Sequence, residues 1–358
     1  MRIATLGVLL ATLALPAGAG AQPSPDRIVA VGDVHGDFER FVGLLRQAGV
    51  IDGKNRWAGG KTHLVQTGDV LDRGPESRRV MDLLMALEEQ ARKAGGKVHA
   101  LIGNHEAMNI LGDLRYVSAG EYEAFRSSRA KELRERAYRA LADSALRDST
   151  AYRKRWEAEH PLGWVEHRLA FEGNGKYGTW IRGHDAVLAL GGYLFLHGGI
   201  GPKYVDVPLE EINARVRKDL EPGATTTEIV TDHEGPLWYR GLAREPDSAI
   251  APLVDRILER FGVEHVVIGH TVTPGAILPR LGAKVIQIDV GLAKYYGGPP
   301  ACLVIERGVP YALHRGELVP LPQDGDVLGY LKQVAALEPP DSRLAQYVGQ
   351  LEAAGTRP

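Results

Sequence analysis

Short apolar segments that each end in a cluster of charged and polar residues recur in the first third of the chain, and they constrain the fold more than any other feature. They cover residues 27–31, 62–66 and 97–102, and their apolar character predicts strands. Apolar residues at helical spacing between them predict two helices. This alternation of strands and helices predicts a parallel sheet with right-handed crossovers. Ligands of such sheets bind outside the carboxyl ends of the strands, where all three polar clusters fall.

The second cluster, residues 67–74, contains two carboxylates and a guanidinium, from Asp69, Asp72 and Arg73. Charges crowded at a strand end desolvate and perturb one another, so a bound cation or anionic ligand would stabilise them. The alternative interpretation is a polar turn that ends a strand. This stretch alone does not decide between the two.

Later apolar runs predict further strands, and the last three are predicted to lie in a second sheet. The runs cover residues 186–190, 193–196, 265–268, 285–288, 301–305 and 310–314. Gly191 and Gly192, between the first two runs, predict a β-hairpin. His197 follows the second run and His270 follows the third, so two more strands are predicted to place a histidine at their ends.

We expect one large domain at residues 27–318 and a helical tail at residues 319–358. Residues 116–167 are predicted to form a helical insertion in the domain, since much of this segment is dense in Arg, Glu and Ala. A solvated insertion and a cap that shapes the substrate site both stay open. The insertion leaves the sheet after one polar cluster and returns before another.

The first residues match a secretory signal peptide. Arg2 precedes a mostly apolar stretch from Ala4 to Leu15, and small residues end at Ala21. About 12 apolar residues are too few to span a membrane, which requires roughly 20. We therefore expect a signal peptide at residues 1–21, cleavage after Ala21, a linker at residues 22–26, and a periplasmic or secreted protein with no membrane span.

Composition argues against several other functions. A net charge of −2 at pH 7 gives no general attraction to nucleic acid, so no nucleic-acid partner is predicted. Cys302 is the only cysteine, which excludes an intrachain disulfide and a cysteine-rich zinc site. Because Cys302 lies in an apolar run typical of a buried strand, a nucleophilic thiol is not expected.

Five polar blocks occur in a fixed order along the chain, and this order is more specific than a set of ordinary polar turns. The blocks are GDVHG, GDVLDRG, GNHE, HGG and GHT, each after an apolar strand. Together they resemble the signature of the calcineurin-like metallophosphoesterases, and specifically of the phosphoprotein phosphatase family. The segments GNHEAMNILGDLRYV and GPLWYRG, with the signal peptide, resemble its Shewanella-like branch, some of whose members are tyrosine phosphatases. The resemblance implies an α/β fold in four layers, in which two mixed β-sheets pack as a sandwich flanked by helices.

The resemblance also implies that two metal ions bind at the ends of the sheets. The implied ligands are Asp33 and His35 for the first ion, Asp69 as a bridge, and Asn104, His197 and His270 for the second. A mixture of carboxylate, imidazole and amide groups suits Mn, Fe or Zn, and Mn is the expected ion. Two such ions lower the pKa of a bridging water and clamp phosphoryl oxygens, so metal-bound hydroxide is the predicted nucleophile.

The remaining implied roles are proton transfer and phosphate binding. His105 is the implied acid that protonates the leaving oxygen, and Asp72 orients it. Arg73 and Arg240, together with Asn104, are implied to bind the substrate phosphate, since a guanidinium fits two phosphoryl oxygens. A surface position for Arg240 is the alternative, because its block matches the family less completely.

The chain departs from the family pattern at Ile102, where many members have an arginine directly before GNHE. One nearby cation is therefore missing. Arg182 is a candidate replacement, although an ordinary exposed arginine is expected at that position.

The predicted function is that of an exported, metal-dependent phosphatase that hydrolyses phosphomonoesters, with phosphotyrosine or phosphoserine and phosphothreonine in proteins as substrates. One alternative is a hydrolase of diadenosine tetraphosphate or another nucleotide on the same fold. A binding protein that holds metal without catalysis is a third hypothesis, disfavoured because the implied ligands and the acid are all present. The oligomeric state is left open.

Overall fold

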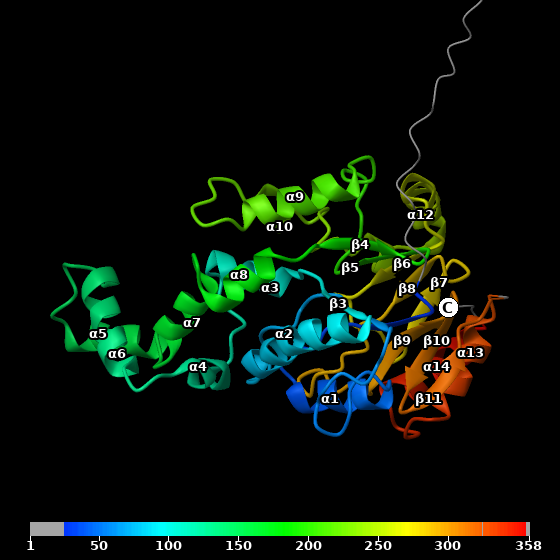
Figure 1. The fold of residues 1–358 in the computed structure, drawn as a ribbon, viewed down its shortest axis with the longest axis horizontal. Coiled ribbons are helices and arrows are strands. Elements are labelled where there is room, and N and C mark those ends of the chain that lie inside the picture. Colours follow the sequence, from blue (N-terminus) through cyan, green and yellow to red (C-terminus); the bar gives the residue numbers. More distant parts are fainter. Residues whose placement is uncertain (1–24, 324, 356–358) are drawn as a thin grey trace, which may run out of the picture.

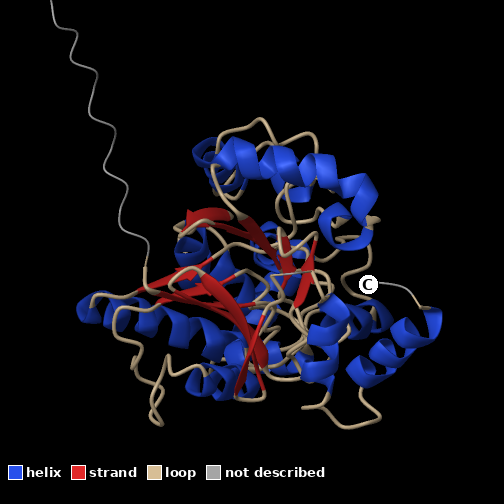
Figure 2. Cartoon of the chain, turned by 90° about the vertical axis from the view of Figure 1, so that its right-hand side faces the viewer, coloured by secondary structure: helices blue, strands red, loops and turns tan. Residues whose placement is uncertain are grey.

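The computed structural model describes residues 25–323 and 325–355. The predicted signal peptide lies outside the described residues, and so does most of the predicted linker. The strands form two mixed sheets in the interior, and helices cover their outer sides (Figure 2). The predicted sandwich of two mixed sheets is therefore confirmed. Within the described ranges, no helix is both long and apolar enough to cross a membrane.

The first sheet contains the three N-terminal strands that the sequence predicts, and its strand order is β11-β10-β9-β1-β2-β3. Its strands are β1 (Arg27–Val31), β2 (His63–Gln66), β3 (Lys97–Ala100), β9 (Ala301–Glu306), β10 (Val309–His314) and β11 (Glu317–Pro320). β1, β2 and β3 are parallel, because α1 (Phe38–Gln47) and α2 (Ser77–Ala94) provide the crossovers. Helix α1 buries one apolar face, which includes Phe41 and Leu45.

The assignment of residues 301–305 and 310–314 to a second sheet is wrong. β9 pairs antiparallel with β1, β10 pairs with β9, and β11 pairs with β10, so all three extend the first sheet. An apolar run predicts a strand but contains no information about its partner, and β9 returns to β1 from the other end of the sequence. β11 also extends the strand pattern to Pro320, which lies inside the predicted helical tail.

The second sheet has the order β4-β5-β6-β8-β7. Its strands are β4 (Val187–Leu190), β5 (Tyr193–Leu196), β6 (His265–Ile268), β7 (Leu278–Arg280) and β8 (Val285–Gln287). The predicted hairpin joins β4 to β5, and β5, β6 and β8 are parallel. Their residues are largely buried, as is typical of parallel strands covered on both faces. The Tyr193 hydroxyl donates to the Gly308 carbonyl at 2.9 Å and so joins the two sheets.

Helices make up the predicted insertion, and its outer part lies away from both sheets (Figure 1). The insertion contains α4 (Ala119–Phe125), α5 (Ala130–Leu141), α6 (Thr150–Glu159) and α7 (Trp164–Phe171). Helices α5 and α6 bury a small cluster of their own around Tyr138 and Trp156. Helix α4, by contrast, contacts α2 of the main domain.

The remaining helices connect or cover the sheets. They are α3 (Asn104–Leu111), α8 (Lys176–Arg182), α9 (Leu209–Asp219), α10 (Glu228–Thr231), α11 (Gly241–Arg244), α12 (Asp247–Phe261), α13 (Val327–Ala335) and α14 (Arg343–Ala354). α13 and α14 lie in the predicted helical tail, and they pack against each other beside the first sheet (Figure 1).

The two sheets meet closely at the carboxyl end of β1, where Gly32 lies. A Cβ atom at this position would lie 2.6 Å from the carbonyl oxygen of Ile288, which follows β8. Backbone atoms of a strand end cannot move away easily. A glycine is therefore required at position 32, directly before Asp33, where the first sheet contacts the second.

Gly32→Ala should lower the free energy of unfolding by about 1–3 kcal/mol, the usual cost of overpacking a core. The matched control is Gly43→Ala in α1, where an added Cβ meets nothing within 4 Å. It should raise the free energy of unfolding by about 0.5–1 kcal/mol, because alanine favours a helix. Chemical denaturation of metal-free protein measures both values. An unchanged unfolding midpoint in Gly32→Ala would show that the sheets do not meet as described.

Candidate metal centre

Polar residues at the strand ends of both sheets come together in one buried place. Seven of them are at most 6% exposed. They are Asp33, His35, Asp69, Asn104, His105, His197 and His270. The fold thus places the five predicted polar blocks at one edge of the sandwich.

The backbone is strained at several of these positions. His35, Asp69 and His270 have φ values of 45°, 57° and 63°, in the left-handed region. This conformation costs a residue other than glycine about 1–2 kcal/mol. The turns are held together by backbone hydrogen bonds, since the N–H groups of Val34 and His35 donate to the Asp69 carbonyl at 3.0 and 2.9 Å. Strain of this kind concentrates at binding and catalytic sites.

Two groups of metal-ligating side chains share the Asp69 carboxylate. His35, Asp69 and His105 form one group, and Asp69, His197 and His270 form the other. Within each group the ligand atoms lie within 4.8 Å of one another. The central position of Asp69 is the one that a bridging ligand would need.

The other two predicted ligands lie beside these groups. An oxygen of Asp33 is 3.8 Å from Nε2 of His35, and its other oxygen accepts a hydrogen bond from the His270 backbone N–H at 3.1 Å. The Asn104 side-chain oxygen is 2.9 Å from Nε2 of His197. All six predicted ligands therefore lie together, although their binding of metal stays a prediction.

The electrostatics of the centre favour a bound cation. Burial raises the pKa of Asp33 well above its ordinary value, and the negative charges of Asp289 and Asp69 add to the shift. Burial lowers the pKa of His270 well below its ordinary value, and its Nε2 has no hydrogen-bond partner among the described residues. Crowded buried carboxylates and a neutral imidazole with a free nitrogen are groups that a metal ion would stabilise. The donors present therefore fit a transition metal.

His105, which belongs to the first group, forms a buried pair with Asp72. Nδ1 of His105 lies 2.5 Å from a carboxylate oxygen of Asp72, as the predicted orienting role requires. Burial alone would lower the pKa of His105, but the charges of Asp69 and Asp72 outweigh it and raise that pKa. The Asn109 side chain donates to the other Asp72 oxygen at 3.0 Å.

Arg73 lies between two tyrosine rings. The centre of its guanidinium is 3.8 Å from the Tyr116 ring centroid and 5.1 Å from that of Tyr295. Its Nε is buried and has no hydrogen-bond partner among the described residues. The rings hold the guanidinium by cation–π contact and leave donors free for an anion.

Arg240 is not a surface arginine, so that alternative is wrong. Its side chain is partly buried and donates to the His270 carbonyl and to the Thr271 hydroxyl, the latter at 3.0 Å. Arg280 holds the segment that follows Arg240 in the chain, because it donates to the carbonyls of Leu242 and Glu245 at 2.7 and 2.6 Å.

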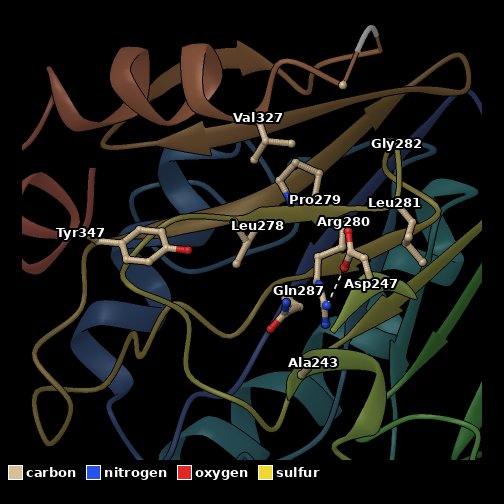
Figure 3. Close-up of a pocket in the computed structure, with 11 residues that line it drawn as sticks. Ala243, Asp247, Leu278, Pro279, Arg280, Leu281, Gly282, Gln287, Val327 and Tyr347 are labelled. Carbon is tan, nitrogen blue, oxygen red and sulfur yellow. Dashed lines mark hydrogen bonds and ion pairs between the residues drawn. The ribbon is translucent and has the colours of Figure 1, made fainter. Parts of the chain in front are cut away.

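Figure 3 shows Arg280 beside Asp247 in a cavity of about 420 Å³ next to β7. The residues that line this cavity include none of the predicted site residues. It is therefore separate from the metal centre.

The comparison with known families decides what kind of site this is. Residues 26–274 match the family model described as calcineurin-like phosphoesterase. The chain belongs to this family. The match covers all five polar blocks completely and includes every predicted site residue.

Relatives of this phosphoesterase include named phosphatases. Shewanella-like protein phosphatase 2 of Arabidopsis thaliana is 31% identical over 296 residues, which cover 79% of this chain and 76% of that protein. Shewanella-like protein phosphatase 1 of Plasmodium berghei is 25% identical over 284 residues, 76% of this chain and 69% of that protein. A solved structure, the cold-active protein-tyrosine phosphatase of a psychrophilic Shewanella species, is 27% identical with a TM-score of 0.64, and the match covers 83% of this chain and 80% of that one. The chain is thus a metal-dependent phosphoesterase with phosphatase relatives.

Sequence reasoning missed two carboxylates of this phosphoesterase site. Asp289 follows β8, and burial raises its pKa to about 6. Glu106 accepts hydrogen bonds from the backbone N–H groups of Asp69, Val70 and Gly103 at 2.8, 2.9 and 2.8 Å, so it holds the Asp69 backbone in place. The rule that selected Asp33, an aspartate just after an apolar strand, would also have found Asp289.

The cation missing before the GNHE block has no replacement in Arg182. Ile102 is buried, and Arg182 lies on α8, where it donates to the Gly173 carbonyl. Within the described part of the chain, its side chain makes hydrogen bonds to Gly173 and Thr179 and to no residue of the metal centre. Of the arginines considered for binding the substrate phosphate, Arg73 and Arg240 therefore remain.

Asp69→Asn should lower the metal content from about two ions per chain to below one, because it removes the shared charge and a bridging oxygen. Elemental analysis after dialysis against trace metal measures this. The control is Asp255→Asn, which breaks only an exposed ion pair with Lys284 and should keep both ions. If Asp69→Asn also kept two ions, the bridging role of Asp69 would be wrong.

Proposed function

We propose that this protein is an exported phosphatase with two metal ions that hydrolyses phosphomonoesters, and that phosphorylated protein side chains are its substrates. The observation that best supports this is the Asp69 carboxylate shared by two groups of candidate ligands, with Asp72 facing His105 of the first group. Mn is the proposed metal, with Fe and Zn as alternatives, since the donor set suits each of them.

The proposed ligands have divided roles. Asp33 and His35 would hold one ion, Asn104, His197 and His270 would hold the other, and Asp69 would contact both. When bound, the two ions would supply Lewis acidity and an activated water. The protein holds these ligands in fixed positions because they lie at buried strand ends.

His105 is the proposed acid. Its Nδ1 faces Asp72, so its Nε2 is the nitrogen on the side of the metal centre, 3.7 Å from an Asp69 oxygen. Negative charge from Asp69 and Asp72 favours the protonated imidazole. The Nε2–H group can then give its proton to the leaving oxygen of the ester, and Asp72 stabilises the remaining N–H.

Arg73 and Arg240 are the proposed phosphate-binding residues. Arg73 is held by Tyr116 and Tyr295, and Arg240 is held against His270. Two guanidinium groups on different elements can contact different phosphoryl oxygens and stabilise the charge of the transition state.

A protein side chain is the proposed substrate, with phosphotyrosine preferred. The names of the relatives support phosphoprotein, and the Shewanella structure supports tyrosine. A cavity of about 370 Å³ beside His35 and Arg73 is lined in part by Tyr295, which is 62% exposed. A binding surface with an exposed aromatic ring suits a side chain presented by a protein.

Export is proposed from the signal-peptide pattern at residues 1–21. After expression of the full chain, N-terminal sequencing of periplasmic protein should begin at Gln22. Mature protein that still begins at Met1 would contradict export.

The substrate proposal is tested by comparing turnover of phosphotyrosine, phosphoserine and phosphothreonine peptides with that of diadenosine tetraphosphate, after reconstitution with Mn²⁺, Fe²⁺ or Zn²⁺. We expect the highest kcat/KM for phosphotyrosine. A nucleotide preference of orders of magnitude would favour the alternative hydrolase. No turnover with any metal would favour a binding protein.

His105→Asn should reduce kcat for phosphoserine peptide by about 10²–10⁴-fold, the usual contribution of an acid. Hydrolysis of p-nitrophenyl phosphate should fall far less, because its leaving group needs no proton. The control is the exposed His233→Asn, which should change neither rate. Equal losses on both substrates would contradict the acid role.

A further inference from the structure

The loop that contains Asp72 and Arg73 is strained and must be held by other parts of the protein. The two residues have φ values of 69° and 66°, so two consecutive non-glycine residues are left-handed. Each costs about 1–2 kcal/mol, and Asp72 is fully buried. A shift of this loop would move the Asp72 carboxylate away from His105.

The start of the helical insertion makes several of the contacts that hold this loop. The Arg73 backbone N–H donates to the Tyr116 carbonyl at 3.1 Å, and the Ser118 hydroxyl donates to the Gly74 carbonyl at 3.1 Å. One turn further along, Glu121 of α4 accepts a hydrogen bond at 3.0 Å from the hydroxyl of Ser77, the first residue of α2. The insertion therefore lies directly behind the Asp72 loop.

Glu121 and His167, both in the insertion, are fully buried and face each other. Oε1 of Glu121 is 3.7 Å from Nε2 of His167. Neither this oxygen nor either ring nitrogen of His167 has a hydrogen-bond partner among the described residues. The rings of Tyr122, Phe125 and Phe171 surround the imidazole, with centroids 5.4, 4.9 and 4.7 Å away. At 3.7 Å the two atoms are slightly too far apart for a hydrogen bond, but a small shift would form one, and buried polar groups of this kind are costly unless they pair.

The surroundings favour a neutral pair. Burial and the charge of Asp72 raise the pKa of Glu121 well above its ordinary value, against the hydrogen bond from Ser77 and the favourable electrostatic effect of the nearby Asp72 backbone N–H. Burial lowers the pKa of His167 to about 3. A protonated carboxyl group then faces a neutral imidazole nitrogen, and its O–H can donate to that nitrogen. Glu121 would contact the Asp72 backbone without adding a second negative charge.

A neighbouring residue of α7 supports Asp72 from a second side. Arg168 donates to the Asn109 carbonyl at 2.7 Å. Asn109 in turn donates to an Asp72 oxygen at 3.0 Å. Adjacent residues of one insertion helix, His167 and Arg168, thus reach Asp72 through Glu121 and through Asn109.

We propose that Glu121, paired with His167, is a positioning residue that holds the Asp72 loop so that Asp72 orients His105 toward the leaving group. The insertion is then part of the apparatus that delivers the proton. The inference rests on the proposed function in one respect, namely that His105 is the acid. A pair that only fills the core would instead affect folding and all substrates alike.

Glu121→Ala should lower kcat for phosphoserine peptide about 10-fold or more, a part of the 10²–10⁴-fold contribution of a general acid. It should lower hydrolysis of p-nitrophenyl phosphate less than about 3-fold and leave KM unchanged, since binding of the phosphate does not depend on the proton. Glu121→Gln keeps the side-chain shape and the acceptor for Ser77, so it should restore most of the loss. The matched control is Glu123→Ala on the same helix, whose exposed side chain pairs only with Arg126.

In a His105→Asn background, Glu121→Ala should have no further effect on phosphoserine peptide, because residues that act through one group are not additive. Equal losses on both substrates, no loss, or a selective loss that persists without His105 would each overturn the inference. Should Glu121→Ala fail to fold, His167→Phe tests the same pair within its aromatic surroundings, and it should show a smaller but equally selective loss.

A readout without turnover separates this inference from the proposed function. In zinc-reconstituted protein, which is diamagnetic, the NMR signal of the His105 Nδ1 proton can be assigned by its absence in His105→Asn. It should move upfield in Glu121→Ala as the hydrogen bond to Asp72 lengthens, and stay in place in Glu123→Ala. An unmoved signal in Glu121→Ala overturns the inference, whereas inactivity of the wild type overturns only the proposed function.

Discussion

Buried negative charge at the edge of the sandwich is the constraint on which the rest of the structure depends. Asp33, Asp69 and Asp289 come from strand ends of two different sheets and lie together, each at most 3% exposed. Like charges cannot all stay ionised there without a cation, so a bound metal ion would stabilise the site. The close contact of the sheets at Gly32 and the backbone hydrogen bonds to Glu106 keep these carboxylates close together.

Strain follows from the same requirement. Strand ends must turn sharply to aim side chains at one point, and His35, Asp69, Asp72, Arg73 and His270 all adopt left-handed backbone. The surrounding core stabilises the turn at His35, and the helical insertion stabilises the loop of Asp72 and Arg73. This division gives a physical reason why an insertion whose outer helices lie far from the sheets also has a buried inner part (Figure 1).

The extent to which sequence could predict this structure differs from feature to feature. Asp33, His35, Asp69 and His105 were identifiable because each follows an apolar strand in a distinctive block. The pairing of β9 with β1 could not be identified, because strands that pair from distant parts of the sequence leave no local pattern. Glu121 and His167 were also hidden, since they lie in a segment dominated by exposed charge. Nothing in the local sequence separates a buried glutamate from its solvated neighbour Glu123.

The most direct test of a site in which two metal ions share Asp69 is an anomalous-diffraction map of crystals grown with Mn²⁺. We expect two peaks about 3.5–4 Å apart, with an Asp69 oxygen bound to both and His105 bound to neither. A single peak, or two peaks that do not share Asp69, would contradict this arrangement.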